Sequence, residues 1–121
     1  MNNTKWYIAD MYWPKADNGA YISHEAISLL NTGDEDCEVK ITMYFMDAEP
    51  KECVPFVCPA RRTKHMRIDK LRYLDGTEIQ RGIGYAALVE CSVPAIVQYT
   101  RVDTTQSELG VATTMAYPVN C

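Results

Sequence analysis

The stretch Cys37-Glu38-Val39-Lys40-Ile41-Thr42-Met43-Tyr44-Phe45 decides the fold class of this 121-residue chain. Apolar side chains fall on every second residue and alternate with polar or amphipathic ones, which gives a period of two over nine residues. Side chains of an extended strand point alternately to its two faces. The pattern therefore predicts a strand with one face in a core and the other in solvent.

The same short-strand pattern recurs along the chain. It predicts three more strands, over 23–30, 84–92 and 95–102, and weaker ones over 6–9, 54–58, 62–68 and 112–117. Turn residues separate them, at Asn18-Gly19, Gly33, Asp75-Gly76 and Gly110 among others. A short helical turn is indicated only over 68–74. Strands at this spacing predict an all-β fold, a single-domain β-sandwich (1–121) of about seven or eight mostly antiparallel strands.

Composition fits a globular domain that needs no covalent or metal staple. Apolar residues make up 47% and charged residues 23% of the chain, which is ordinary for such a domain. The apolar runs are far shorter than the ~20 residues that cross a bilayer. No apolar signal-peptide segment follows the first five residues. We therefore expect a cytoplasmic protein.

Cysteine usage agrees with a reducing compartment. The chain has five cysteines, an odd number, and free buried thiols are the expectation for them. Cys53 and Cys58 lie five residues apart, so on an extended strand their sulfurs would point to opposite faces. They would then be unable to hold one ion together, and we expect no metal site.

The sequence lacks the motifs of the common enzyme classes. It contains no Gly-rich phosphate loop, no G-x-S-x-G elbow, no H-E-x-x-H and no zinc-spaced Cys/His set. Ser23-His24-Glu25 has the residue types of a catalytic triad, but strand neighbours point to opposite faces and cannot form that relay. Paired acids for glycoside cleavage can come from anywhere in a fold, and no pair stands out. We expect no catalytic residue and no cofactor, and hence no enzyme.

One basic segment stands out in a chain whose net charge is −4. Residues 61–72 hold six of the twelve Lys and Arg residues and His65, against the single Asp69. On an extended strand, alternation would divide this segment into an outer row, Arg61, Thr63, His65 and Arg67, and a second row, Arg62, Lys64, Met66 and Ile68. Arg forks suit a carboxylate, a phosphate or vicinal hydroxyls. The alternative is an edge strand that its charges protect from aggregation.

Two other groups of residues are candidates for binding. The strand that ends in Gln98-Tyr99-Thr100-Arg101-Val102-Asp103 turns from apolar to polar, with Gln98 expected to be half-buried. The alternative there is a surface ion pair between Arg101 and Asp103. Tyrosines outnumber phenylalanines eight to two, a ratio that suits sugar stacking or an oligomer interface. For any one tyrosine, a half-exposed place on a strand is the alternative.

Several blocks of the sequence resemble the sensory rhodopsin transducer family. They are Ile22-Ser23-His24-Glu25, the turn at 30–36, Ile41-Thr42-Met43-Tyr44, Asp47-Ala48-Glu49-Pro50, and the long blocks 59–67 and 92–103. The similarity runs from about residue 6 to 103, and the chain departs from the pattern over 71–84 and after 105. The resemblance implies a cytoplasmic β-sandwich that forms a homotetramer. It also implies coupling to a microbial photoreceptor in one relative, and small-molecule binding, with sugars as candidates, in the wider superfamily.

From residues and resemblance together we expect a non-catalytic sensor or adaptor that binds a small polar metabolite, such as a sugar, and relays a signal to a partner. The alternatives are a transducer that docks on a membrane photoreceptor through residues 61–72, and a carbohydrate-modifying enzyme. No nucleic-acid partner is expected. The expected ligand-binding residues are the polar ones of the resembling blocks, with Trp6 as a stacking wall: His24, Glu25, Arg62, Lys64, His65, Arg67, Gln98 and Arg101. Alternation places them on more than one face, so some of them must be structural.

Overall fold

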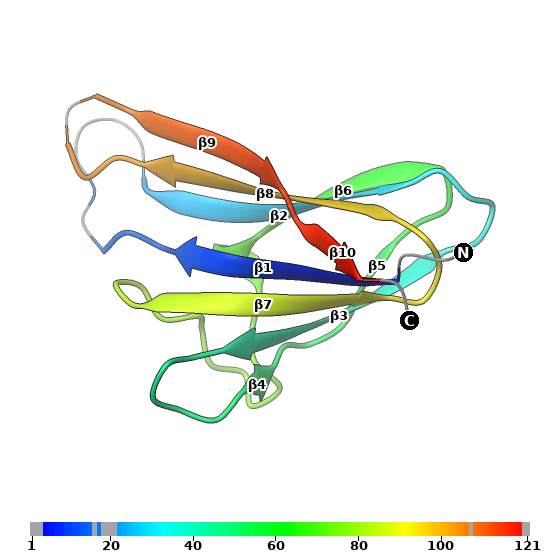
Figure 1. The fold of residues 1–121 in the computed structure, drawn as a ribbon, viewed down its shortest axis with the longest axis horizontal. Helices are drawn as coiled ribbons and strands as arrows, with labels where there is room; N and C mark the ends of the chain where they lie inside the picture. The colour runs from blue at the N-terminus through cyan, green and yellow to red at the C-terminus, as the bar shows by residue number, and fades with distance from the viewer. Residues whose placement is uncertain (1–3, 16, 18–21, 107, 120–121) are drawn as a thin grey trace.

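A computed structural model describes residues 4–15, 17, 22–106 and 108–119 of the chain. The turn expected at Asn18-Gly19 and the fifth cysteine, Cys121, lie outside this part. The described residues form ten strands and one 3₁₀ turn, η1 (Figure 1). In chain order the elements are β1 (Lys5–Tyr12), β2 (His24–Asn31), β3 (Cys37–Tyr44), β4 (Lys51–Glu52), β5 (Phe56–Cys58), β6 (Arg62–Arg67), η1 (Ile68–Lys70), β7 (Gly84–Cys91), β8 (Ile96–Asp103), β9 (Gly110–Met115) and β10 (Tyr117–Val119).

The strands form two antiparallel sheets that pack face to face. Sheet A has the order β10-β1-β7-β3-β4, with β5 also paired to β3, and sheet B has the order β6-β2-β8-β9. This confirms the all-β sandwich predicted from the sequence. The strand number exceeds the predicted seven or eight, partly because β4 has only two residues, too few to show a period in the sequence.

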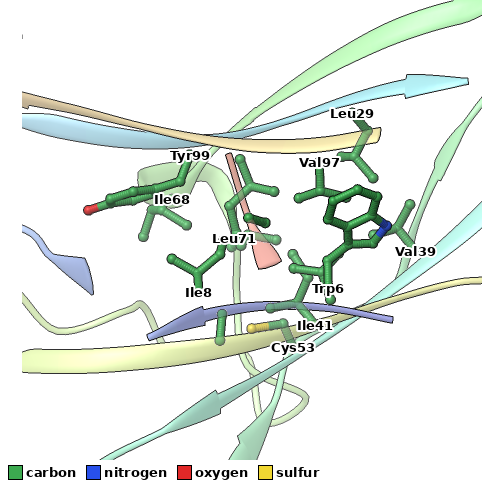
Figure 2. Close-up of a cluster of buried hydrophobic side chains, with 14 of the residues drawn as sticks. Trp6, Ile8, Leu29, Val39, Ile41, Cys53, Ile68, Leu71, Val97 and Tyr99 are labelled. Atoms are coloured by element: carbon green, nitrogen blue, oxygen red, sulfur yellow. The ribbon is translucent and has the colours of Figure 1, made fainter. Parts of the chain in front are cut away.

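The hydrophobic core lies between the two sheets, where the alternation predicts it. β3 buries Cys37, Val39, Ile41 and Met43 and exposes or half-exposes the residues between them. Figure 2 shows Trp6 and Ile41 of sheet A facing Leu29 and Val97 of sheet B. Fully burying such an aliphatic side chain contributes about 1.5–3 kcal/mol relative to leaving it exposed. The core therefore provides the main favourable free energy that holds the sheets together.

The chain passes from one sheet to the other at Ala116. The sequence predicts one strand over 112–117, but β9 pairs with β8 in sheet B and β10 pairs with β1 in sheet A. Between them Ala116 is 3% exposed, and its N–H donates to the carbonyl of Val97 at 3.1 Å. Ala116 is thus buried with the core residues at the point where the chain crosses from the edge of one sheet to the edge of the other. Figure 1 shows β10 crossing toward β1 from the end of β9.

The cysteines correct one prediction. Cys53 and Cys58 both lie in the core, at 1% and 0% exposure, and do not point to opposite faces. The prediction assumed one continuous strand. In the structure Cys53 forms a bridge with Tyr73, and residues 54 and 55 separate it from β5. The four described cysteines are free and buried, and burial raises the pKa of the Cys53 and Cys91 thiols to about 12.

Because the four thiols are buried, they should resist modification in the folded protein. We expect iodoacetamide at neutral pH to leave Cys37, Cys53, Cys58 and Cys91 unmodified in native protein. Denaturation without reductant should expose all five cysteines of the chain to alkylation. Peptide mass spectrometry of both samples measures this. Rapid native labelling of Cys53, or a disulfide in the denatured sample, would contradict the prediction.

Candidate functional site

A groove opens on the side of the sandwich, between β1 of sheet A and the edge strand β9 of sheet B. β10 covers β1 only from Lys5 to Tyr7, and beyond that point the side of the sandwich is open. The resulting groove, here called the β1–β9 groove, has a volume of about 690 Å³. Its lining comes from β1, β8, β9 and β10: Tyr7, Ile8, Ala9, Asp10, Tyr99, Arg101, Ala112, Thr114, Met115, Tyr117 and Val119.

A β-bulge in β1 shapes one wall of the groove. The register with β7 shifts between Ile8, opposite Ala87, and Met11, opposite Tyr85, so β1 carries one extra residue. Two successive residues, Ala9 and Asp10, are consequently exposed, and Met11 returns to the core. A bulge next to a site is a common way to re-aim a side chain. Here it presents the Asp10 carboxylate to the groove.

Arg101 lies inside the groove, on the inner side of β8. Its guanidinium lies 3.8 Å from Asp10, and its side chain is 28% exposed. Its Nε donates to the Tyr99 hydroxyl at 3.2 Å, and the ring centroids of Tyr12 and Tyr99 lie about 6 Å away, at 6.0 and 5.8 Å. The Tyr99 hydroxyl thus holds the guanidinium on the side that faces the core, while the other side of the guanidinium reaches solvent within the groove.

Glu25 lies behind Arg101 with no exposed surface. Its carboxylate accepts hydrogen bonds from the hydroxyls of Tyr85 and Tyr99 and, at 2.9 Å, from the backbone N–H of Tyr12. Burial raises the pKa of the Glu25 carboxyl, against the opposing effect of these donors and of the Arg101 charge. Burial and the neighbouring carboxylate also raise the pKa values of Tyr85 and Tyr99. The groove therefore connects through Arg101 and Tyr99 to a buried carboxyl.

Two of the expected ligand-binding residues are inaccessible. Trp6 is 2% exposed within the core, so no ligand can stack on it without disrupting the fold. In Figure 2 its ring lies at the opposite end of the drawn cluster from the Tyr99 hydroxyl. Glu25, being fully buried, can reach the groove only through Tyr99 and Arg101. Of the nine expected residues, Arg101 is the one that lines the groove.

Four other expected residues gather on the outer face of sheet B. The strand register places His65 and Gln98 on either side of Ser28, and Arg67 next to Ala26, while His24 pairs with Val102. Gln98 is exposed there, not half-buried as expected, because its side chain points away from the core. Arg67 binds Asp69 through two hydrogen bonds of 3.0 and 2.9 Å. The sheet itself separates these four side chains from the groove.

The basic segment is an edge strand of sheet B with partly compensated charge. The predicted division into two rows is present within β6, where Met66 packs against the core while Thr63 and His65 are exposed. The predicted outer row was wrong in including Arg61, which lies in the turn before the strand with a φ of 55° and is not extended. Ile68 is buried but begins η1. Three of the six basic residues form ion pairs with this chain's own acids, namely Arg61 with Asp34, Arg67 with Asp69 and Arg72 with Glu78. Arg62 and Lys64 lie on the inner side of the edge, opposite Asn31 and Leu29.

Sequence reasoning missed the partners of Arg101. Asp103 was the expected ion-pair partner, but Asp103 accepts hydrogen bonds from Thr105 and Arg101 lies beside Asp10. Asp10 comes from a distant part of the chain and reaches the groove through the bulge. The tyrosines of the groove, Tyr7 and Tyr117, were noted only as part of the excess of tyrosine. No short sequence pattern connects these residues.

Within the part of the chain that is described, no three His, Cys, Asp or Glu side chains cluster so that they could hold a metal ion. In the same part, no helix is long and apolar enough to span a bilayer.

The fold places the chain among all-β sandwiches of two antiparallel sheets. A family model described as Anabaena sensory rhodopsin transducer matches residues 1–118. The chain therefore belongs to this family, as the sequence blocks indicated. No curated protein matches the chain.

Two solved structures are similar to the chain along almost its whole length. The Anabaena sensory rhodopsin transducer is 41% identical, with a TM-score of 0.74, and the match covers 88% of this chain and 94% of that one. The Thermotoga maritima protein 1070 is 29% identical, with a TM-score of 0.82, and the match covers 96% and 94%. The chain thus shares the fold of a transducer family, for which the family description indicates signalling.

The environment of Glu25 predicts how stability depends on pH. A carboxyl whose pKa is higher in the folded than in the unfolded protein stabilises the folded state at pH values below its unfolded pKa, near 4.5. This stabilising contribution is lost as the pH rises through the pKa of the folded state. Glu25→Gln keeps the shape but removes the titration. Relative to this variant, the wild type should lose unfolding free energy as the pH rises from about 4.5 toward 8.

Urea denaturation of both proteins across this pH range measures the effect. Glu90→Gln, a half-exposed glutamate of β7, is the control and should follow the wild type. Parallel stability curves for wild type and Glu25→Gln would show that burial does not perturb Glu25.

Proposed function

We propose that this chain is a non-catalytic adaptor of the transducer family that binds a small polyhydroxylated metabolite, such as a sugar or a sugar acid, in the β1–β9 groove and relays its presence to a partner protein. The observation that carries the proposal is Arg101, whose guanidinium is fixed on its inner side by Tyr99 and reaches the groove beside Asp10. A fixed fork of donors next to a carboxylate acceptor is suited to vicinal hydroxyls.

The walls of the groove support the same ligand class. Tyr7 and Tyr117 are cross-strand partners at the closed end of the groove, 40% and 72% exposed. Amphipathic rings of this kind offer a flat apolar surface and a polar tip, which suits the apolar face and the hydroxyl rim of a sugar. Pockets for small molecules combine mostly apolar walls with a few fixed polar groups. The groove has both.

The placement of the carboxylates favours binding over catalysis. A glycosidase needs two carboxyl groups that flank the same bond. Asp10 is 94% exposed at the mouth of the groove, while Glu25 is buried behind Tyr99 and faces no ligand. A carbohydrate-modifying enzyme would need the second carboxylate within the groove. We therefore infer that the domain binds its ligand without transforming it.

A second candidate function follows from the family. The 41%-identical relative is a sensory rhodopsin transducer, so docking on a membrane photoreceptor is the alternative role for this chain. The basic segment 61–72 is the candidate docking surface. The three ion pairs to this chain's own acids weaken its positive potential, which makes it a less effective electrostatic target. In either role we expect a cytoplasmic homo-oligomer, with the tetramer that the resemblance implies.

A thermal-shift screen of sugars, sugar acids and sugar phosphates tests ligand binding. A compound that binds only the native state raises the melting temperature in proportion to the logarithm of its concentration. We expect at least one sugar or sugar acid to produce such a concentration-dependent rise. Melting temperatures that no compound of the three classes changes would overturn the proposal.

Substitutions then locate the site. Arg101→Ala should weaken the compound roughly ten- to a hundredfold, the expected loss for one charge-assisted contact. Arg101→Lys, which keeps the charge beside Tyr99 but lacks the fork, should lose about tenfold and serves if the alanine variant does not fold. Lys40→Ala removes an exposed cation on sheet A and is the control for charge. Arg67→Ala tests the outer face of sheet B, and a loss confined to that variant would place the site there.

A further inference from the structure

A second hollow lies near β4, which is at the opposite edge of sheet A from β10. Its lining comes from the turn between β3 and β4 (Figure 1), the start of β4, and the segment that leads into β7. This hollow, here called the β4 hollow, has a volume of about 550 Å³ and shares no lining residue with the β1–β9 groove. It is therefore a separate candidate site.

Lys51 brings a positive charge to the β4 hollow from the inner face of sheet A. It is the cross-strand partner of the fully buried Met43, and directly opposed side chains leave a sheet on the same face. Its ammonium group lies 4.4 Å from the centroid of the Tyr73 ring. The next residue, Glu52, is paired with Lys40. Lys51 itself forms no ion pair within the described part of the chain.

Edge protection does not explain this lysine. An inward-pointing charge on an edge strand can block the addition of another strand. Here the backbone next to Lys51 is already covered, because the N–H of Leu74 donates to the carbonyl of Glu52 at 3.0 Å. The N–H of Val54 likewise donates to the carbonyl of Arg72 at 2.8 Å. The charge of Lys51 therefore needs another explanation.

Tyr73 is the one fully buried residue among those that line the β4 hollow, with 4% of its surface exposed. A bridge to Cys53 and the hydrogen bond of 2.8 Å from the Gly76 N–H to its carbonyl fix its backbone. Burial raises the pKa of Tyr73 to about 12, so its hydroxyl keeps its proton at neutral pH. This hydroxyl has no hydrogen-bond partner among the described residues, whereas most buried hydroxyls have one. A ligand in the hollow would supply it.

The β4 hollow carries charges of both signs. Asp47 is exposed on the turn between β3 and β4 and, like Lys51, forms no ion pair with any other described residue. Glu78 also lines the hollow, and its carboxylate lies 3.5 Å from the guanidinium of Arg72. The carboxylates would repel a ligand that is only anionic, and Lys51 would repel one that is only cationic. A zwitterion satisfies both charges.

Apolar side chains form another part of the wall. Met46 is 92% exposed, and Phe45 and Ile83 are half-buried. The methionine side chain is flexible and adapts to the shape of what it binds. Pockets for small molecules have volumes of about 300–1,000 Å³ and combine apolar walls with a few polar groups. An apolar wall beside two opposite charges matches an amino acid with an apolar side chain.

We propose that the β4 hollow binds a free α-amino acid whose side chain is apolar. The Lys51 ammonium and the Tyr73 hydroxyl bind its carboxylate, and the Asp47 carboxylate binds its ammonium group. The apolar wall contacts its side chain. This site goes beyond the ligand site in the β1–β9 groove and does not depend on it.

A thermal-shift assay with leucine, methionine and phenylalanine as probes tests for binding. A compound that binds only the native state raises the melting temperature as its concentration increases, and we expect this of at least one of the three. The N-acetyl derivative of that probe lacks the ammonium group, and its amide lacks the carboxylate, so both should bind at least tenfold more weakly. Melting temperatures that none of the three probes changes, or derivatives that bind as tightly as the parent, would overturn the proposal.

Substitutions then assign the binding to the β4 hollow. Lys51→Met keeps an unbranched side chain over Tyr73 but removes the charge, and it should weaken the probe roughly ten- to a hundredfold. Asp47→Asn should weaken it about tenfold. The matched controls are Lys40→Met and Glu49→Gln, which lie outside the lining and should bind as the wild type does. A folded Lys51→Met or Asp47→Asn variant with wild-type affinity overturns the site.

Tyr73→Phe separates a binding role of the hydroxyl from a structural one. Removing a buried hydroxyl that has no protein partner should leave the unfolding free energy of the ligand-free protein unchanged or higher. The same change should weaken the probe about tenfold. Urea denaturation without ligand and titration with the probe measure the two effects. A loss of stability with unchanged binding would show that the hydroxyl serves the fold, and its assignment to the site would be wrong.

Discussion

The buried carboxyl of Glu25 is the constraint around which the two sheets are arranged. A carboxyl group without solvent is costly unless its oxygens accept hydrogen bonds. Tyr99 supplies one hydroxyl from sheet B, and Tyr85 supplies the other from sheet A. The third donor, the N–H of Tyr12, lies beyond the bulge of β1. One acidic side chain thus fixes the relative position of three strands, β1, β7 and β8, at the open end of the sandwich.

The remainder of the interface between the sheets is held by less specific forces. Around Trp6, Leu29 and Val97 the sheets meet through apolar side chains, which stabilise the fold in proportion to the area they bury. Such packing tolerates substitution by similar volumes. The Glu25 cluster does not, because removing the Tyr85 hydroxyl takes away the donor to Oε1, and removing the Tyr99 hydroxyl leaves Oε2 with the Tyr12 N–H. Stability therefore comes mainly from the apolar core, and positional precision from the Glu25 cluster.

The sequence was sufficient for features that depend on local periodicity. β3, β2 and β7 alternate regularly, and their positions and buried faces follow from a period of two. The face that each residue of β6 presents was predictable for the same reason. Local pattern failed where the chain leaves a regular strand: at the bulge of β1, at the crossing through Ala116, and between Cys53 and β5, where the odd spacing no longer alternates.

The candidate site was predictable only in part, because its residues meet through long-range register. Arg101 stood out from its polar strand end, but Asp10 and Tyr117 are brought to it by the pairing of β1 with β7 and β10. Polar residues that are close in sequence, such as His24 and Glu25, were separated by alternation onto opposite faces of β2. Grouping polar residues by sequence block therefore combined two surfaces that the sheet keeps apart.

In the proposed role, the groove and the buried cluster would connect a bound ligand physically to a partner. A ligand that draws the Arg101 guanidinium toward the groove weakens its hydrogen bond to Tyr99, and Tyr99 is one of the donors that Glu25 requires. Tyr85 and Tyr12, bound to the same carboxylate, belong to the opposite sheet. Occupancy of the groove would thus act on both sheets at once through one carboxyl group.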